Sequence, residues 1–281
     1  MKSIVLLSGG LDSTTALYLV RHANRAVPDE RAADRRRASR TVPDNRAADR
    51  RLADRRLTNR RQSNWSDVRP IASEHVCLTI HYGQLHEREV ESAKKITSHL
   101  KLEHWIVPLS LPWGGSALLE GRGDPLGRPS LKIPKGRDKS EISKEIPVTY
   151  VPARNSIFLS LAASLAEVEG AEAIYFGANA LDYSGYPDCR PEFIEAFEEM
   201  IRRGTRAGSE GKRIRVVAPL LRMTKAEIVK LGRELGVPFE WTWSCYEGKD
   251  TPCGECDSCI LRAKGFREAG VEDPLIAGVS R

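Results

Sequence analysis

The sequence predicts an α/β protein: a doubly wound parallel sheet with a small metal-binding subdomain at the C-terminal end. Three observations carry this prediction. Short apolar runs alternate with segments of helical periodicity, which is typical of a parallel sheet covered by helices on both faces. A Gly-rich turn, Ser8-Gly9-Gly10, follows the first apolar run. Four of the six cysteines lie within residues 245–259.

The expected elements follow from apolar periodicity, caps and breakers. Strands are expected at 4–7, 76–83, 104–109, 173–177 and 214–218. Helices are expected from 16 to about 22 and at 86–100, 155–168, 191–201 and 224–235, with a weaker helical piece at 116–119. The expected apolar stripe of the third helix is Ile157, Phe158, Leu161, Ala162, Leu165 and Val168. Pro191 suits a first helical position and Thr224 suits an N-cap.

A chain of 281 residues fits one large domain with an appendage. We expect a nucleotide-binding α/β domain over 1–238, interrupted at about 22–70, and a four-cysteine zinc subdomain over 239–281. No run of about eighteen apolar residues and no signal-peptide pattern occur, so we expect a cytoplasmic enzyme with no membrane partner.

The basic charge of the chain belongs to one low-complexity segment. Residues 21–69 hold fifteen arginines, seven acidic residues and no lysine, a surplus of eight positive charges. Because the whole chain carries +6, the remainder carries −2. A ten-residue motif at 27–36 returns imperfectly at 42–51. A solvated insertion is the favoured interpretation, since large apolar residues are scarce; an arm that binds RNA or phosphate is the alternative.

The first strand, the glycines and the following helix together predict a phosphate site. Gly9 and Gly10 let the backbone approach an anion, which meets free N–H groups and the positive end of the helix dipole. No Gly-Lys-Ser/Thr follows, so the turn is not a Walker loop. The residues of this stretch are Leu7, Ser8, Gly9, Gly10, Leu11, Asp12, Ser13, Thr14, Thr15, Ala16 and Leu17, and the resemblance described below implies that they bind ATP.

The cysteine cluster predicts a closed structural metal site. Its ligands would be Cys245, Cys253, Cys256 and Cys259. Four thiolates in a compact knuckle favour zinc, and an iron–sulfur cluster is the rival. Cys77 is expected in the core. Cys189 lies near the expected pocket, although a buried structural role is the commoner one.

The loop after the fourth strand is dense in polar and aromatic side chains. It stands at the carboxyl end of a parallel strand, where such sheets bind ligands. A flat heterocycle can stack on its tyrosines and donate to its carboxylates. The predicted substrate-binding residues are Asn179, Asp182, Tyr183, Gly185, Tyr186, Asp188 and Arg190.

Six segments together resemble the 7-cyano-7-deazaguanine synthases, zinc-containing members of the PP-loop ATPases, which have an adenine-nucleotide alpha-hydrolase-like fold. They are Ser-Gly-Gly-Leu-Asp-Ser-Thr-Thr at 8–15, His-Tyr-Gly-Gln at 81–84, Tyr-Val-Pro-Ala-Arg-Asn at 150–155, Asn-Ala-Leu-Asp-Tyr-Ser-Gly-Tyr-Pro-Asp-Cys-Arg-Pro-Glu-Phe at 179–193, Thr-Trp-Ser-Cys-Tyr at 242–246 and Cys-Gly-Glu-Cys-Asp-Ser-Cys at 253–259. The resemblance covers the chain outside 22–70. The Arg-rich insertion is a departure to which no family function is carried over.

The resemblance implies a ligase of queuosine biosynthesis. It would convert 7-carboxy-7-deazaguanine and ammonia to the nitrile through adenylated intermediates, with ATP and Mg²⁺ and one structural zinc, as a homodimer with no stable nucleic-acid partner. The expected catalytic residues are Asp12, Ser13, Arg154 and Lys225. Asp12 would bind Mg²⁺, and Arg154 and Lys225 would neutralise phosphate charge; a solvated lysine is the alternative for Lys225. Asn155 is as readily a helix cap as a substrate contact.

Two rival functions remain open at this point. Another PP-loop adenylating enzyme, a tRNA thiolase or an amide ligase, would keep the phosphate turn and change the acceptor. A zinc-knuckle, Arg-rich RNA-binding protein would bind RNA in a salt-sensitive way without the turn.

Overall fold

The computed structural model describes residues 2–25, 74–84, 87–119, 131–137, 142, 146–179 and 186–277. The insertion expected at 22–70 therefore lies outside the described residues from residue 26 onward. None of the described helices is long and apolar enough to cross a membrane.

All five strands belong to one parallel sheet. They are β1 (Lys2–Leu6), β2 (Glu74–His81), β3 (Glu103–Pro108), β4 (Ala171–Phe176) and β5 (Arg215–Val217), in the order β3-β2-β1-β4-β5. The order reverses direction between β1 and β4. Ligands bind to sheets of this kind outside the carboxyl ends of the strands at that switch point. The predicted fold class is confirmed.

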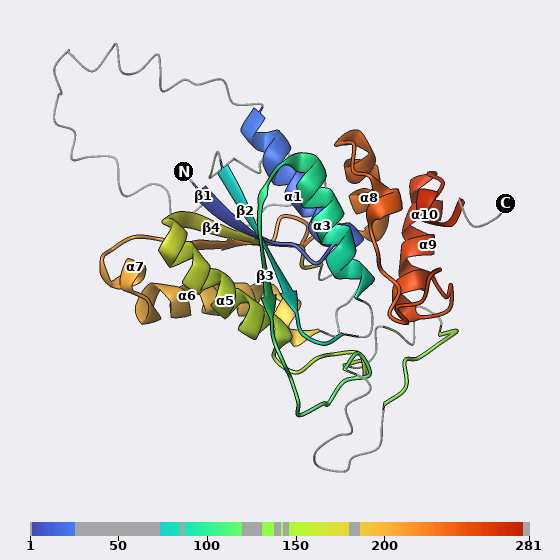
Figure 1. The fold of residues 1–281 in the computed structure, drawn as a ribbon, viewed down its shortest axis with the longest axis horizontal. Helices are drawn as coiled ribbons and strands as arrows, with labels where there is room; N and C mark the ends of the chain where they lie inside the picture. The colour runs from blue at the N-terminus through green and yellow to red at the C-terminus, as the bar shows by residue number, and fades with distance from the viewer. Residues whose placement is uncertain are drawn as a thin grey trace, which may run out of the picture.

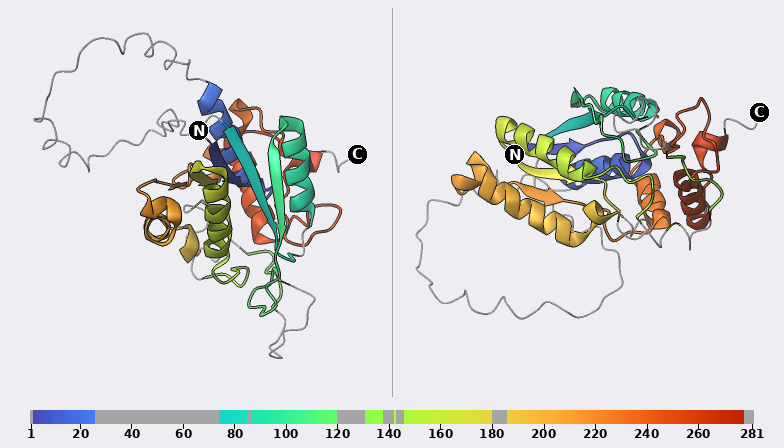
Figure 2. Two further views of the ribbon diagram at one scale, coloured as in Figure 1. Left: turned by 60° about the vertical axis from the view of Figure 1, so that its left-hand side comes forward. Right: turned by 90° about the horizontal axis from the view of Figure 1, so that it is seen from below.

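Helices cover both faces of the sheet (Figures 1 and 2). Those that pack on it are α1 (Leu11–Arg25) and α3 (Arg88–Leu100) on one face, and α5 (Arg154–Glu169) and α6 (Pro191–Gly204) on the other. The short α7 (Arg206–Ser209) follows α6. Beside α1 lies α8 (Lys225–Glu234), which packs against α9 (Asp257–Ala269), and the short α10 (Pro274–Ala277) follows α9.

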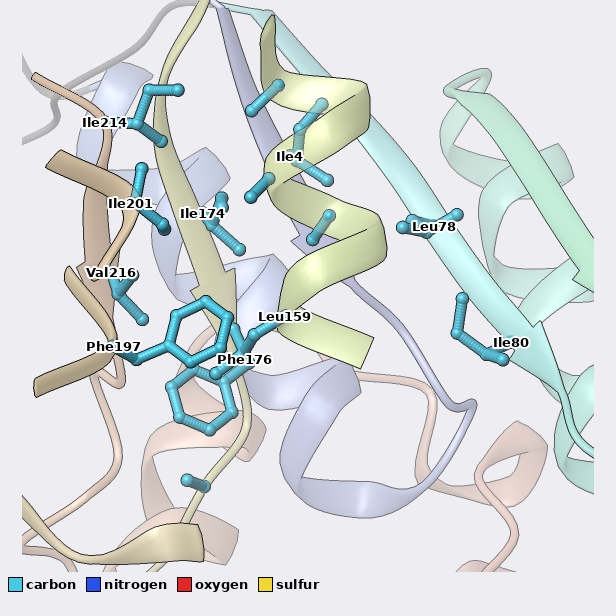
Figure 3. Packing of buried hydrophobic residues seen from close by; sticks show 14 of the residues in the cluster. Ile4, Leu78, Ile80, Leu159, Ile174, Phe176, Phe197, Ile201, Ile214 and Val216 are labelled. Carbon is cyan, nitrogen blue, oxygen red and sulfur yellow. The ribbon is translucent and has the colours of Figure 1, made fainter. Parts of the chain in front are cut away.

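The strands are apolar on both sides because helices bury both sides. In β1, Ile4 belongs to the core under α5, whereas its neighbour Val5 belongs to the core under α1 and α3. Figure 3 shows Leu159 of α5 and Phe197 of α6 packed with Phe176 at the end of β4. This period-two alternation between two covered faces explains why the central strands β1, β2 and β4 read as continuous apolar runs, whereas the edge strand β3 has no buried residue.

Several local predictions are confirmed and others need correction. Pro191 stands at the start of α6, and Thr224 caps α8 in a reciprocal capping box with Glu227. The first helix continues to Arg25, three residues beyond the predicted fade at His22. Residues 116–119 form a hydrogen-bonded turn, not a helix.

The apolar stripe predicted for α5 is only partly confirmed. Ala162 is buried, and Ile157, Phe158, Leu161 and Leu165 are partly buried against the core. The buried side chains that face the sheet are one leucine and three alanines: Leu159, Ala162, Ala163 and Ala166. Val168 is 80% exposed. The error arose because α5 is apolar almost all round, so periodicity alone does not distinguish its faces.

A buried arginine holds the C-terminal segment together. Arg262 of α9 donates to both oxygens of Asp273, at 2.6 and 2.8 Å, and to the carbonyl oxygens of Thr242 and Phe239 at 3.1 and 3.0 Å. Its side chain is 5% exposed. Its hydrogen bonds therefore join segments that are distant from one another in sequence.

We expect Arg262→Leu to lower the free energy of unfolding by about 3–5 kcal/mol, because it leaves a buried carboxylate without its partner. Arg267→Leu, an exposed position on the same helix, is the matched control and should change stability by less than about 0.5 kcal/mol. Urea unfolding of both variants measures the difference. Equal stabilities for the two variants would contradict this role of Arg262.

Candidate functional site

A cavity of about 260 Å³ opens at the switch point of the sheet. Its walls come from the ends of β1 and β4, the first turns of α1 and α5, the start of α8 and the segment 243–246. It therefore lies where the order of the strands and the turn at Ser8-Gly9-Gly10 both predicted a ligand.

The turn after β1 is stabilised by its own hydroxyl groups. The Ser8 and Ser13 Oγ atoms lie 3.0 Å apart, the Gly10 N–H donates to Ser8 Oγ at 3.1 Å, and the Ser8 N–H donates to Ser13 Oγ at 3.2 Å. Gly9 has φ +89°, and a Cβ there would lie 2.1 Å from the Glu89 carbonyl oxygen. Glycine is required at this position by conformation and by the close approach of α3.

The predicted ATP-binding stretch divides into two groups and one further residue, Gly9, which packs against the backbone of α3 and is not part of the cavity lining. The members that line the cavity are Leu7, Ser8, Gly10, Leu11, Asp12 and Ser13. The members that point into the core are Thr14, Thr15, Ala16 and Leu17, all essentially inaccessible to solvent. The N–H groups of the first helical turn have no partner within the helix, so an anion in the cavity meets them and the positive end of the dipole.

Asp12 and Lys225 form an ion pair at the floor of the cavity. Lys225 Nζ lies 2.7 and 2.6 Å from the two Asp12 carboxylate oxygens, and the side chains are only 11% and 24% exposed. The first residue of α8 is thus brought to the first turn of α1 across 213 positions of sequence. The prediction that both residues belong to one site agrees with this placement.

Arg154 lies in the wall of the cavity opposite the Asp12–Lys225 pair. Its guanidinium carbon lies 5.8 Å from the ring centre of Tyr82 and 5.9 Å from that of Phe158, and an N–H donates to the Tyr82 hydroxyl at 3.2 Å. Ala153, with φ +54°, turns the chain sharply into α5 immediately before this arginine. Ring faces attract a guanidinium, so the charge is held at the cavity although no carboxylate among the described residues forms an ion pair with it.

Asn155 does not cap α5, because the N-cap position belongs to Ala153. Its backbone N–H donates to the carboxylate of Asp188 at 3.0 Å, and its side-chain amide donates to the Asp188 carbonyl oxygen and to Cys189 Sγ at 3.0 and 3.3 Å. Burial raises the pKa of Asp188. The carboxylate of Asp188 thus supplies the cap that the sequence of α5 itself lacks.

The residues predicted to bind substrate lie in four kinds of place. Asp188 is buried beside the start of α5 and is not part of the cavity lining. Asn179 and Tyr186 line the cavity, where the Asn179 amide donates to the Met223 carbonyl oxygen at 2.6 Å. Arg190 is exposed at the N-cap of α6, away from the cavity lining. Asp182, Tyr183 and Gly185 lie outside the described residues.

Sequence reasoning missed several residues of the lining. Three of these residues flank Cys245, the first cysteine of the cluster: Trp243, Ser244 and Tyr246. The segment reaches the cavity because the Trp243 N–H donates to the Gly9 carbonyl oxygen at 3.1 Å. Arg262 and Glu89 also line it. The Thr-Trp-Ser-Cys-Tyr segment was the sequence signal that could have placed Trp243, Ser244 and Tyr246 at the cavity. Arg262 had no such signal, because it is a single arginine within a helix.

The four clustered cysteines come together as predicted. All four Sγ atoms lie within 4.8 Å of one another, and those of Cys253 and Cys259 are 4.0 Å apart. Zinc–sulfur bonds of about 2.3 Å in a tetrahedron place the sulfurs about 3.8 Å apart, so a closed four-thiolate site fits. Hydrogen bonds with Cys256 and Cys259 hold the pKa of Cys245 far below its usual range.

Part of the long loop before α5 lies against this cluster. Lys135 makes an isolated antiparallel bridge with Cys256, and the Gly136 N–H donates to the Glu255 carbonyl oxygen at 2.9 Å. Arg137 pairs with the carboxylate of Asp257. The described part of the loop therefore supports the metal site.

A family model described as queuosine biosynthesis protein QueC matches residues 70–270. The 7-cyano-7-deazaguanine synthase of Trichodesmium erythraeum (strain IMS101) is 44% identical over 278 residues, which cover 98% of this chain and all of that protein. The enzyme of the same name from Anaeromyxobacter dehalogenans (strain 2CP-C) is 51% identical over 201 residues, or 70% of this chain and 82% of that one.

Among solved structures, the U34-tRNA thiolase NcsA from Methanococcus maripaludis with its [4Fe-4S] cluster matches 95% of this chain and 64% of that chain. The sequence identity is 15% and the TM-score 0.41. A likeness this loose says nothing about which metal the four cysteines hold.

Cys256→Ser should empty the metal site, because three thiolates close a tetrahedral site poorly. The purified full-length chain should contain one zinc, and the variant should contain far less. Cys77→Ala, at a cysteine buried in β2, is the control and should keep its metal. Elemental analysis with an assay for acid-labile sulfide measures this; iron with sulfide in place of zinc would contradict the zinc assignment.

Cys189 should be a poor nucleophile although it lines the cavity. Burial, reinforced by the nearby Asp188, raises the pKa of its thiol to about 12. Only about one thiol in ten thousand is then ionised at pH 8, and the fraction rises tenfold per pH unit below the pKa. Alkylation of the full-length chain followed by peptide mass spectrometry should show this rise, whereas a labelling rate that levels off near pH 8 would contradict it.

Proposed function

The chain belongs to the QueC family of queuosine biosynthesis proteins, and on that premise we propose that it makes 7-cyano-7-deazaguanine from 7-carboxy-7-deazaguanine and ammonia, with ATP. The relatives that match it over nearly its whole length carry the name of that synthase. The observation that carries the proposal is the cavity at the switch point, with a phosphate turn and opposed charged groups in its walls.

The chemistry requires activation of a carboxylate. Oxide is too poor a leaving group for ammonia to displace directly. Attack of the substrate carboxylate on the α-phosphorus of ATP expels pyrophosphate and leaves AMP as the leaving group. Ammonia then displaces AMP to form the amide. A second adenylation, on the amide oxygen, allows AMP to leave again as the nitrile forms.

The first turn of α1 is suited to hold the departing pyrophosphate. Its unpaired N–H groups and the hydroxyls of Ser8 and Ser13 converge on the cavity. Such donors stabilise charge that develops on the phosphate oxygens and need no reorganisation during the reaction. Magnesium bound with ATP supplies charge neutralisation at the phosphates, and Asp12 is the carboxylate placed to hold it.

The two cationic side chains, Lys225 and Arg154, have different roles in this proposal. Lys225 is paired with Asp12. If Asp12 held the magnesium ion, the Lys225 ammonium would be free to bind a phosphate oxygen. Arg154 faces the cavity from the other side, beside the aromatic rings of Tyr82 and Phe158. A planar substrate that lies between these walls would place its carboxylate near Arg154 and its ring near the loop that follows β4.

The remaining assignments follow from the same proposal. We assign one structural zinc to the four-cysteine site, a cytoplasmic homodimer as the working form, and no stable nucleic-acid partner. Free ammonia is the simplest nitrogen donor. The tRNA thiolase alternative is disfavoured because, among the described residues, the cavity holds one cysteine, Cys189, whose thiol burial keeps protonated.

One reaction tests the proposal. Purified chain, ATP, Mg²⁺, ammonium and 7-carboxy-7-deazaguanine are incubated, and the products are read by mass spectrometry. The nitrile with AMP is the expected result. The nitrile with ADP would overturn the adenylation step, and no nitrile from folded, metal-loaded protein would overturn the substrate.

Asp12→Ala should lower nitrile formation by at least about 100-fold, since it removes the magnesium ligand and leaves Lys225 without its partner. The metal content of the cysteine site should not change. Glu210→Ala, which removes an exposed ion pair with Arg206 on α7, is the control and should keep full activity. Activity of Asp12→Ala within a few-fold of the unmodified protein would contradict the role of Asp12.

A further inference from the structure

A second cavity lies at the same edge of the sheet and takes no part in the site at the switch point. It has a volume of about 400 Å³. Its described lining consists of residues 81–83 at the end of β2, residues 108–112 and Gly114 at and after the end of β3, and Leu119. Because parallel sheets bind ligands at the carboxyl ends of their strands, this cavity is placed to bind a ligand of its own.

Tyr82 is a shared wall of the two cavities. Among the described residues, it is the one that lines both. Its neighbours in sequence alternate: Ile80 and Gln84 line the first cavity, whereas His81 and Gly83 line the second. The side chain of Tyr82 is therefore enclosed between the cavities, and the residue is only 4% exposed.

The reacting carbon of the proposed substrate belongs close to this wall. Arg154, where the proposed reaction places the substrate carboxylate, donates a hydrogen bond to the Tyr82 hydroxyl at 3.2 Å. A carboxylate held by Arg154 therefore has its carbon near Tyr82, on the side of the first cavity. A nucleophile that arrives through the second cavity meets Tyr82 as the last wall before that carbon.

The proposed reaction needs a third reactant besides ATP and the heterocycle. Pockets for a single drug-sized ligand have volumes of about 300–1,000 Å³. The first cavity has about 260 Å³, so ATP and the heterocycle together leave no passage in it for ammonia. Ammonia that reaches the adenylated substrate therefore needs an entrance of its own.

The lining of the second cavity suits a small uncharged molecule. Its described residues include no aspartate, glutamate, lysine or arginine, and they include three leucines and two prolines. A phosphate or a carboxylate that entered would lose its hydration without gaining a charged partner. Ammonia is neutral and smaller than the other reactants, so it enters without this cost.

Polar groups stand where the second cavity meets solvent. The His81 side chain is 37% exposed, and its Nε2 lies 3.5 Å from a carboxylate oxygen of Glu87, which is 76% exposed. An exposed carboxylate attracts ammonium, the form of ammonia that predominates at neutral pH. A neutral imidazole can accept the extra proton, and the remaining ammonia can then cross the apolar lining.

We propose that the second cavity is the entrance for ammonia and leads it past Tyr82 to the carbon held at Arg154. The inference rests on the proposed function, because it takes the adenylated heterocycle as the acceptor. Ammonium leaves one proton at His81, which passes it to water. The lone pair of ammonia then forms a bond to the acyl carbon, the bond from this carbon to the phosphate-bound oxygen breaks, and AMP leaves with that electron pair. The new nitrogen releases one proton, so the products are the amide and AMP.

Filling the second cavity tests the proposal. Ser110 and Pro112 line it and are exposed, so Ser110→Trp and Pro112→Trp should fill it without disturbing the core. In the purified full-length chain we expect each change to raise the KM for ammonium at least about tenfold and to leave kcat at saturating ammonium within about twofold. Exchange of labelled pyrophosphate into ATP, which needs 7-carboxy-7-deazaguanine but no ammonia, should be unchanged.

Ser98→Trp is the matched control, at an exposed serine of α3 that lines neither cavity, and should keep the KM for ammonium of the unmodified chain. An unchanged KM for ammonium in both lining variants, with exchange retained, would overturn the proposal. Loss of exchange in the lining variants alone would also overturn it, since the cavity would then serve ATP or the heterocycle. No exchange in the unmodified chain would instead refute the proposed function, and the inference with it.

Discussion

The site depends on how closely three backbones meet at the turn after β1. Gly9 packs against the backbone of α3, and its carbonyl oxygen accepts the Trp243 N–H of the C-terminal segment. On the other side, Gly177 ends β4 against the backbone of Ser13, where a Cβ would lie 2.7 Å from two backbone atoms. Any side chain at Gly9 or Gly177 would push apart the parts that form the cavity.

This packing explains why the cysteine site matters to a reaction that it does not touch. The segment that leads into the cluster supplies Trp243 and Ser244 to the cavity wall, and α9, which begins after Cys256, supplies the buried Arg262. A metal bound there would hold the ends of that segment in one place. Loss of the metal would therefore act on nucleotide binding through the position of this wall.

The parallel sheet, the helix start at Pro191, the N-cap at Thr224 and the clustering of the four cysteines could be predicted because each has a local sequence signal. Apolar runs, breakers and cysteine spacing depend on neighbours a few residues away. The Asp12–Lys225 pair spans 213 positions, and its two residues were predicted as site members but not as partners. The cap that Asp188 provides for Asn155 crosses 33 positions and had no local signal.

The prediction for α5 was only partly right for a related reason. Periodicity identifies a buried face by contrast with a polar one, and α5 has little contrast to offer. The structure shows that the most buried residues are Leu159 and three alanines, and that Val168, predicted in the stripe, is exposed.

The central claim is that the carboxylate of the substrate attacks the α-phosphorus of ATP in the cavity beside the turn after β1. Exchange of labelled pyrophosphate into ATP measures that step alone, because the adenylated substrate must return to ATP. The account predicts exchange that requires 7-carboxy-7-deazaguanine and proceeds without ammonia. Absence of exchange, with inorganic phosphate released from ATP in its place, would contradict it.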